Sequence, residues 1–163
     1  MRETQQSINE WVEVTFGPVG SHLRVATRAN QEMAELLHAL SANDRAKAAD
    51  ETADVMIVLL RLAERLHFDL LAHLEHPYDL GNPLESAASA NKQLASLIAF
   101  LSLSTAPPDP EHVVDIASTL MRLGSQCGCN IFAEIDNKMT INRNRVWELD
   151  GTGCGHHRER RAS

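Results

Sequence analysis

The chain has 163 residues and a formal net charge of −7 at pH 7. It is therefore long enough for one domain with an apolar core, and its acid excess argues against a general nucleic-acid-binding surface. Its longest apolar run, 53–60, contains Asp54 and is far too short to cross a bilayer, and its polar N-terminus has no apolar signal-peptide core. We therefore expect a soluble, cytoplasmic protein that binds neither nucleic acid nor membranes.

The spacing of apolar residues predicts an all-α protein. Aromatic residues make up only 4% of the chain, whereas Ala, Leu and Glu, which favour helices, are frequent. Seven segments have helical spacing, and none has a convincing strand pattern. The first predicted helix is 4–16, the second begins after the N-cap Ser21, and the third is 44–66. A short fourth helix is capped by Asp69, and a fifth begins at about 83. The sixth has Pro110 in its first turn, and the seventh is capped by Asn130.

The later helices repeat the earlier ones at a constant offset of 61 residues. Segment 91–98 matches 30–37, and 120–123 matches 59–62. The offset is the same in separate helices and needs no gap, which indicates a tandem duplication.

The duplicated unit is a helical hairpin, and the predicted copies are about 22–76 and 83–144. We expect both copies to lie in a single domain, 1–150, followed by a polar and basic tail, 151–163.

Four acids stand at matched positions on the second and third predicted helices. Glu32 and Glu35 are spaced i, i+3, as are Glu51 and Asp54, so each pair shares one helix face. Folding the hairpin near Asn43 brings Glu35 level with Glu51, and Glu32 level with Asp54. Four carboxylates beside an apolar core are costly unless they are neutralised. The pattern therefore predicts a site for a hard divalent cation, Mg²⁺ with Mn²⁺ able to substitute, and such ions usually accompany phosphorylated substrates.

The second repeat has lost most of these acids. At the equivalent positions it carries Gln93, Ser96, His112 and Asp115. We expect this repeat to shape the pocket rather than to hold a metal cluster.

The acids resemble the Glu-x-x-Glu and Glu-x-x-Asp signature of the all-α nucleoside triphosphate pyrophosphohydrolases, the MazG-like superfamily, and in particular its phage and bacterial dNTP pyrophosphohydrolases. Segment 138–147, Lys-Met-Thr-Ile-Asn-Arg-Asn-Arg-Val-Trp, resembles the segment that ends many members. The resemblance covers about 20–153. It implies a MazG-like helical bundle made of the two degenerate repeats, in which the four acids bind Mg²⁺ and support catalysis.

The implied reaction is hydrolysis of a (d)NTP to a (d)NMP and diphosphate, in nucleotide-pool control. Phage-type members act on purine dNTPs, including dGTP, whereas other relatives prefer dUTP or dCTP, so the base stays open. The resemblance also implies a homodimer or higher homo-oligomer in the cytoplasm of a bacterium or a phage-infected host. Glu35 is one candidate to orient the attacking water, but the sequence does not assign this role.

Basic residues near the C-terminus are candidates for phosphate binding. Lys138, Arg143 and Arg145 suit the β- and γ-phosphates, because arginine makes bidentate contacts with phosphate. Asn142 is a candidate for phosphate or sugar. Trp147 is a candidate either for the core or for stacking on the ligand.

The first helix supplies the candidate base site. Ile8, Trp11 and Val12 share one face and form an apolar slot on which a base can stack. The alternative is that Trp11 anchors this helix to the bundle.

Two rival functions remain. Glu35-x-x-His38 and Glu64-x-x-His67 match the Glu-x-x-His element of di-iron carboxylate bundles. However, Glu64 follows Glu51 by thirteen residues, about 20 Å along a helix, so the two motifs cannot share a metal pair. The other rival is a non-enzymatic helical interaction module.

The three cysteines make neither a disulfide framework nor a standard zinc site, because their number is odd and two of them stand in Cys-Gly-Cys. They are Cys127, Cys129 and Cys154.

Overall fold

The computed structural model describes residues 2–75, 79–149, 151 and 153–157. The predicted end of the first repeat, residue 76, and the last part of the predicted tail, 158–163, lie outside them. The described residues confirm the all-α class, with one small hairpin added. The elements are α1 (Gln5–Phe16), α2 (His22–Ser41), α3 (Arg45–Arg65), the 3₁₀ helix η1 (Leu71–His73), α4 (Pro83–Leu103), α5 (Pro110–Gln126), α6 (Ile131–Arg143), β1 (Trp147–Leu149) and β2 (Gly155–His157).

Side-chain caps set the helix starts, as the sequence predicted at Ser21 and Asn130. Ser21 accepts a hydrogen bond from the backbone N–H of Arg24, and Asn130 accepts from Phe132 and Ala133. These bonds satisfy donors that have no partner inside the first turn.

The predicted short helix after Asp69 is only a single 3₁₀ turn. Leu70, just before the turn, is fully buried, and its N–H donates to Gln5 Oε1 at 2.9 Å. This segment is too short to nucleate an α-helix, so its tertiary anchor decides its shape.

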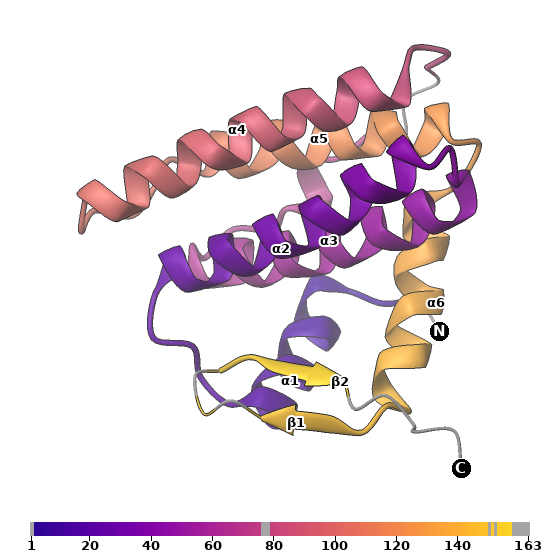
Figure 1. Ribbon diagram of the computed structural model, residues 1–163. Helices are drawn as coiled ribbons and strands as arrows, with labels where there is room; N and C mark the ends of the chain where they lie inside the picture. The colour runs from indigo at the N-terminus through magenta and orange to yellow at the C-terminus, as the bar shows by residue number, and fades with distance from the viewer. Residues whose placement is uncertain (1, 76–78, 150, 152, 158–163) are drawn as a thin grey trace.

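Helix α3 lies at the centre of the fold and packs against α1, α2, α5 and α6. Figure 1 shows the α4–α5 hairpin stacked on the α2–α3 hairpin. Helix α1 and the β-hairpin lie on the other side of α2 and α3, and α6 closes one end. The α2–α3 hairpin is therefore covered on both faces. Among the described residues, no helix is both long and apolar enough to cross a membrane.

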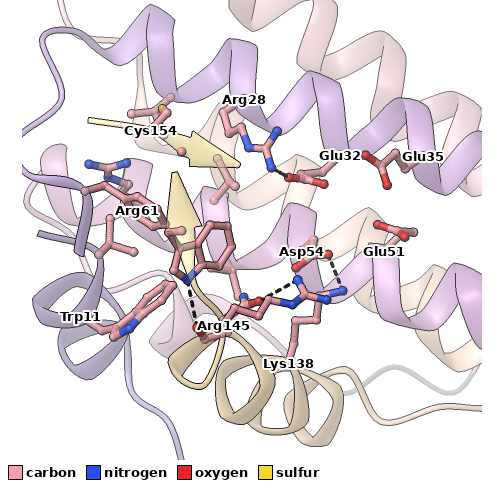
Figure 2. Close-up of a pocket in the computed structure, with 18 of the residues that line it drawn as sticks. Trp11, Arg28, Glu32, Glu35, Glu51, Asp54, Arg61, Lys138, Arg145 and Cys154 are labelled. Atoms are coloured by element: carbon pink, nitrogen blue, oxygen red, sulfur yellow. Dashed lines mark hydrogen bonds and ion pairs between the residues drawn. The ribbon is translucent and has the colours of Figure 1, made fainter. Parts of the chain in front are cut away.

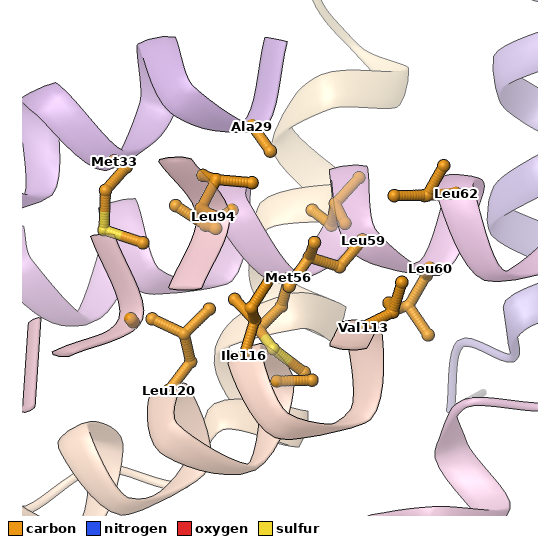
Figure 3. Packing of buried hydrophobic residues seen from close by; sticks show 14 of the residues in the cluster. Ala29, Met33, Met56, Leu59, Leu60, Leu62, Leu94, Val113, Ile116 and Leu120 are labelled. Atoms are coloured by element: carbon orange, nitrogen blue, oxygen red, sulfur yellow. The ribbon is translucent and has the colours of Figure 1, made fainter. Parts of the chain in front are cut away.

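The core fills the space between the two stacked hairpins (Figure 3) and continues to α1 and α6, where Ile8 and Met139 are buried. Met33 and Leu59 of the first hairpin are fully buried, and so are Leu94 and Leu120, which stand 61 residues further along the chain. Burial of each such side chain contributes about 1.5–3 kcal/mol. The stacking of the hairpins holds α2 and α3, and the acids on them, in a fixed relation.

The short hairpin corrects the prediction that the chain has no strand. β1 and β2 pair antiparallel, with Trp147 opposite His157 and Leu149 opposite Gly155. Strands of three residues are too short for an alternating pattern to be recognised in the sequence. Gly151 and Gly153, with φ of 74° and 81°, supply the backbone conformation of the turn. The first part of the predicted tail is thus packed onto the domain.

Candidate functional site

One pocket contains most of the predicted site residues. It is lined from α1, α2, α3, α6, β1 and β2, and encloses roughly 950 Å³, counting the part open to solvent. Figure 2 shows acids at one end of the pocket, and Trp11, Arg61 and Cys154 at the other.

The acids form two groups that share Glu51. Carboxylate oxygens of Glu32, Glu35 and Glu51 lie within 4.8 Å of one another, and so do those of Asp50, Glu51 and Asp54. Glu51 is 1% exposed and Glu32 is 6% exposed. Glu35 lies beside Glu51, as the hairpin geometry predicted. Asp50 was not predicted, although its place four residues before Asp54 was a usable signal.

Basic side chains of the same chain form ion pairs with some of these acids. Arg28 pairs with Glu32, and Lys47 pairs with Glu51. Lys138 is 3% exposed, and its Nζ lies 2.6 Å from Asp54 Oδ2 and 2.7 Å from Asp50 Oδ2. The pairs of Arg28 and Lys47 span i, i+4, a spacing that could have been recognised in the sequence. Lys138, predicted to bind phosphate, here bridges two acids at the edge of the pocket.

Burial and crowding perturb two of the acids. Burial raises the pKa of Glu32 to about 7; Asp54, Glu35 and Glu51 add to the rise, and Arg28 opposes it. Burial also raises the pKa of Asp54 to about 6, against the opposing effect of Lys138. Both carboxylates are thus poorly stabilised as anions by the protein alone, and a cation near them would lower both pKa values.

The donor set suits a hard divalent ion. Every candidate ligand atom is a carboxylate oxygen, the type preferred by Mg²⁺ and Mn²⁺, whereas zinc sites favour nitrogen and sulfur. Two oxygens on one Mg²⁺ lie at most about 4.2 Å apart, close to the 4.8 Å limit within which each group falls. His38 and Glu64 belong to neither group, so the motifs of the di-iron alternative do not meet.

The other end of the pocket is apolar and aromatic. The rings of Trp11, Phe16 and Trp147 meet edge to face, with centroids 5.0–6.0 Å apart. Trp147 also donates from Nε1 to the backbone oxygen of Asn142 at 3.0 Å. Four aliphatic residues complete the walls: Val12, Val25, Ile57 and Val58. A flat apolar group fits such walls.

The remaining predicted residues divide into two sets. Asn142 and Arg145 line the pocket, and Arg145 Nη1 donates to Asn142 Oδ1 at 3.2 Å. Ile8 does not line it, because it is 1% exposed in the core. Arg143 also lies outside it: Nε and Nη2 donate to the two carboxylate oxygens of Glu3 at 3.1 and 2.9 Å. The structure therefore brings together Trp11, Val12, Lys138, Asn142, Arg145 and Trp147 with the acids, but not Ile8 or Arg143.

Arg61 is a pocket residue that the sequence did not indicate. It is 6% exposed, and Nη1 donates to the backbone oxygen of Gly153 at 2.7 Å. Burial lowers its pKa, and the nearby Cys154 and Glu13 oppose that change. Because the contact between Arg61 and Gly153 spans 92 residues, no local sequence pattern predicts it.

Comparisons of the chain with protein-family models, with curated proteins and with solved structures found no match.

Proposed function

We propose that the protein is a metal-dependent nucleoside triphosphate pyrophosphohydrolase, which converts a (d)NTP and water to a (d)NMP and diphosphate. The observation that carries the proposal is one pocket with two different ends. One end is lined by Glu32, Glu35, Glu51 and Asp54, and the other has three aromatic rings. A nucleoside triphosphate has the matching parts, since its base is flat and its phosphates bind proteins through divalent ions.

The acids hold the cation, and the other residues place the substrate. A bound Mg²⁺ or Mn²⁺ would supply positive charge to the phosphate oxygens and would lower the pKa of a water molecule bound to it. Glu32, Glu35, Glu51 and Asp54 would be its ligands, and Asp50 lies close enough to join them.

The basic and aromatic residues have complementary roles in this proposal. Lys138 and Arg145 stand beside the acids, where phosphate charge would accumulate. Trp11 and Trp147 form the wall against which the base stacks. Purine dNTPs such as dGTP are one substrate class, and dUTP or dCTP is the alternative.

We also propose the MazG-like arrangement of two degenerate hairpin repeats. Its support is the equal burial of residues 61 positions apart, Met33 with Leu94 and Leu59 with Leu120. His112 and Asp115, which stand where the first repeat has Glu51 and Asp54, are exposed. In the part of the chain that the structure describes, this arrangement leaves one acid site, on the first repeat.

A homodimer would bring four such hairpins together. Analytical ultracentrifugation tests this part of the proposal, and a single species at the 18.0 kDa of one chain across micromolar concentrations contradicts it.

A screen of all common NTPs and dNTPs with Mg²⁺ or Mn²⁺ tests the activity, with diphosphate resolved from orthophosphate. We expect diphosphate and a nucleoside monophosphate in equal amounts. D54N should abolish turnover while helicity by circular dichroism is retained. The matched control is D115N, at the exposed equivalent position on α5, which should keep full activity. Release of orthophosphate alone, or equal activity of D54N and the wild type, refutes the proposal.

A thermal-denaturation experiment with the same metals and nucleotides separates the enzyme from an interaction module. A metal with a nucleotide should raise the melting temperature of an enzyme, because both bind only the folded state. The melting temperature of a non-enzymatic interaction module should not change when metal and nucleotide are added.

A further inference from the structure

Arg61 stands at the end of the pocket that lies furthest from the acids. Figure 2 shows it in the same region as Trp11 and Cys154, across the pocket from the acidic side chains. Apart from Arg61, the residues around this end are mostly aromatic, aliphatic or glycine. A charged donor at an otherwise apolar end of a binding pocket is the type of group that fixes the orientation of a ligand.

The guanidinium group of Arg61 is held in place by the backbone. Nη1 donates to Gly153 O at 2.7 Å and Nη2 donates to Gly17 O at 3.2 Å. Glu13 Oε1 lies 3.6 Å from Nη2. These contacts join α3 to the end of α1 and to the turn before β2, and they leave the arginine little freedom to move.

A guanidinium has five N–H groups, and the contacts to Gly153, Gly17 and Glu13 use at most three of them. Nε is buried and has no hydrogen-bond partner among the residues that the structure describes. A buried N–H without an acceptor is unfavourable. Arg61 lines the pocket, so a ligand that brings an acceptor to the guanidinium would use one of its remaining donors, whereas a ligand that brings an N–H there would face only donors.

The orientation of a bound nucleotide decides which of its atoms reaches Arg61. If the phosphates lie at the acids, as the proposed function requires, the edge of the base furthest from the sugar points to the opposite end. On that edge guanine and hypoxanthine carry O6, and uracil and thymine carry O4, all of which accept hydrogen bonds. Adenine and cytosine carry amino groups there, which donate.

We propose that Arg61 selects the nucleobase by this edge, so that the pocket favours oxo-bases over amino-bases. The inference rests on the proposed function for the placement of the phosphates. The inference predicts that substrates are distinguished by the oxygen or amino group on this edge, and not by whether the base is a purine or a pyrimidine.

Matched pairs of substrates test it directly. dITP and dATP differ at position 6 by oxygen against an amino group, and dUTP and dCTP differ in the same way at position 4. We expect kcat/KM to be about 10- to 100-fold higher for the oxo member of each pair, the discrimination that one hydrogen bond to a charged group provides. In R61M this ratio should fall to about one in both pairs.

The matched control is R65M. Arg65 lies one turn further along α3, also has a buried Nε without a partner among the described residues, and does not line the pocket. R65M should keep the wild-type ratio. Wild-type ratios near one, a preference for the amino bases, or an R61M variant that folds and keeps the preference would each overturn the inference.

Binding of the monophosphates dIMP and dAMP, measured by calorimetry with Mg²⁺ present, is independent of turnover, because neither is a substrate, and of the stability of R61M. Tighter binding of dIMP supports the role of Arg61 even if no triphosphate is hydrolysed, an outcome that would count only against the proposed function. Equal binding of the two, or binding of neither, counts against Arg61 as the selecting residue.

Discussion

The raised pKa of Glu32 makes the metal-free protein lose stability as the pH increases. The pKa is about 7 in the folded protein, against an ordinary value of 4.5. Between these values the folded protein holds a proton that the unfolded chain has released, so the free energy of unfolding falls as the pH rises from about 4.5 to about 7. The difference between the two pKa values corresponds to about 3 kcal/mol. Asp54 acts in the same direction below its own pKa of about 6, which leaves the interval from 6 to 7 mainly to Glu32.

E32Q isolates this effect, because glutamine has nearly the same shape and does not titrate. In EDTA, the wild type should lose about 3 kcal/mol more than E32Q between pH 4.5 and pH 8. Urea denaturation at half-unit pH steps measures the difference. Parallel curves for the two proteins over that range would show that the carboxyl is not perturbed by its surroundings, and the reasoning about the crowded acid end would fail with it.

Three further substitutions test other parts of the structure. E51Q alters the one carboxylate common to both acid groups. It should abolish turnover, and it should also abolish the rise in melting temperature that Mn²⁺ gives the wild type. If Mn²⁺ raises the melting temperature of E51Q as much as that of the wild type, Glu51 is not a shared ligand. L59A removes a fully buried core side chain and should lower the free energy of unfolding by about 2–5 kcal/mol in urea, whereas a loss under 1 kcal/mol would mean that the two hairpins are loosely packed. G153A places a Cβ 2.7 Å from Val19 Cα and should destabilise the protein by about 1–3 kcal/mol. G151A, which has a similar φ and open space around it, should cost less, and equal losses in the two variants refute the close packing.

Helices and the acid end could be predicted because their determinants are local. The starts of α2 and α6 follow from Ser21 and Asn130, which cap them. Glu35 and Glu51 meet because one tight turn joins two regular helices, so their positions along each helix determine which residues face each other.

The rest of the site depends on contacts between distant parts of the chain. Lys138 reaches Asp50 across 88 positions, and Arg143 reaches Glu3 across 140. A basic residue near a helix end looks equally suited to phosphate or to a carboxylate, and only the fold shows that Arg143 has its acid partner outside the pocket. The β-hairpin was missed for a related reason, because its two strands of three residues are defined by their pairing and their contact with the domain.

The two ends of the pocket also differ in how easily they would unfold locally. The acid groups come from α2 and α3, neighbours in the chain, whereas the Gly153 anchor joins residues 92 positions apart. Segments held by few, distant contacts open at lower free energy than the central helices. Hydrogen exchange should therefore be faster in β2 than in α3, and a partly opened molecule would still bind a cation after it had lost the ability to tell one base from another.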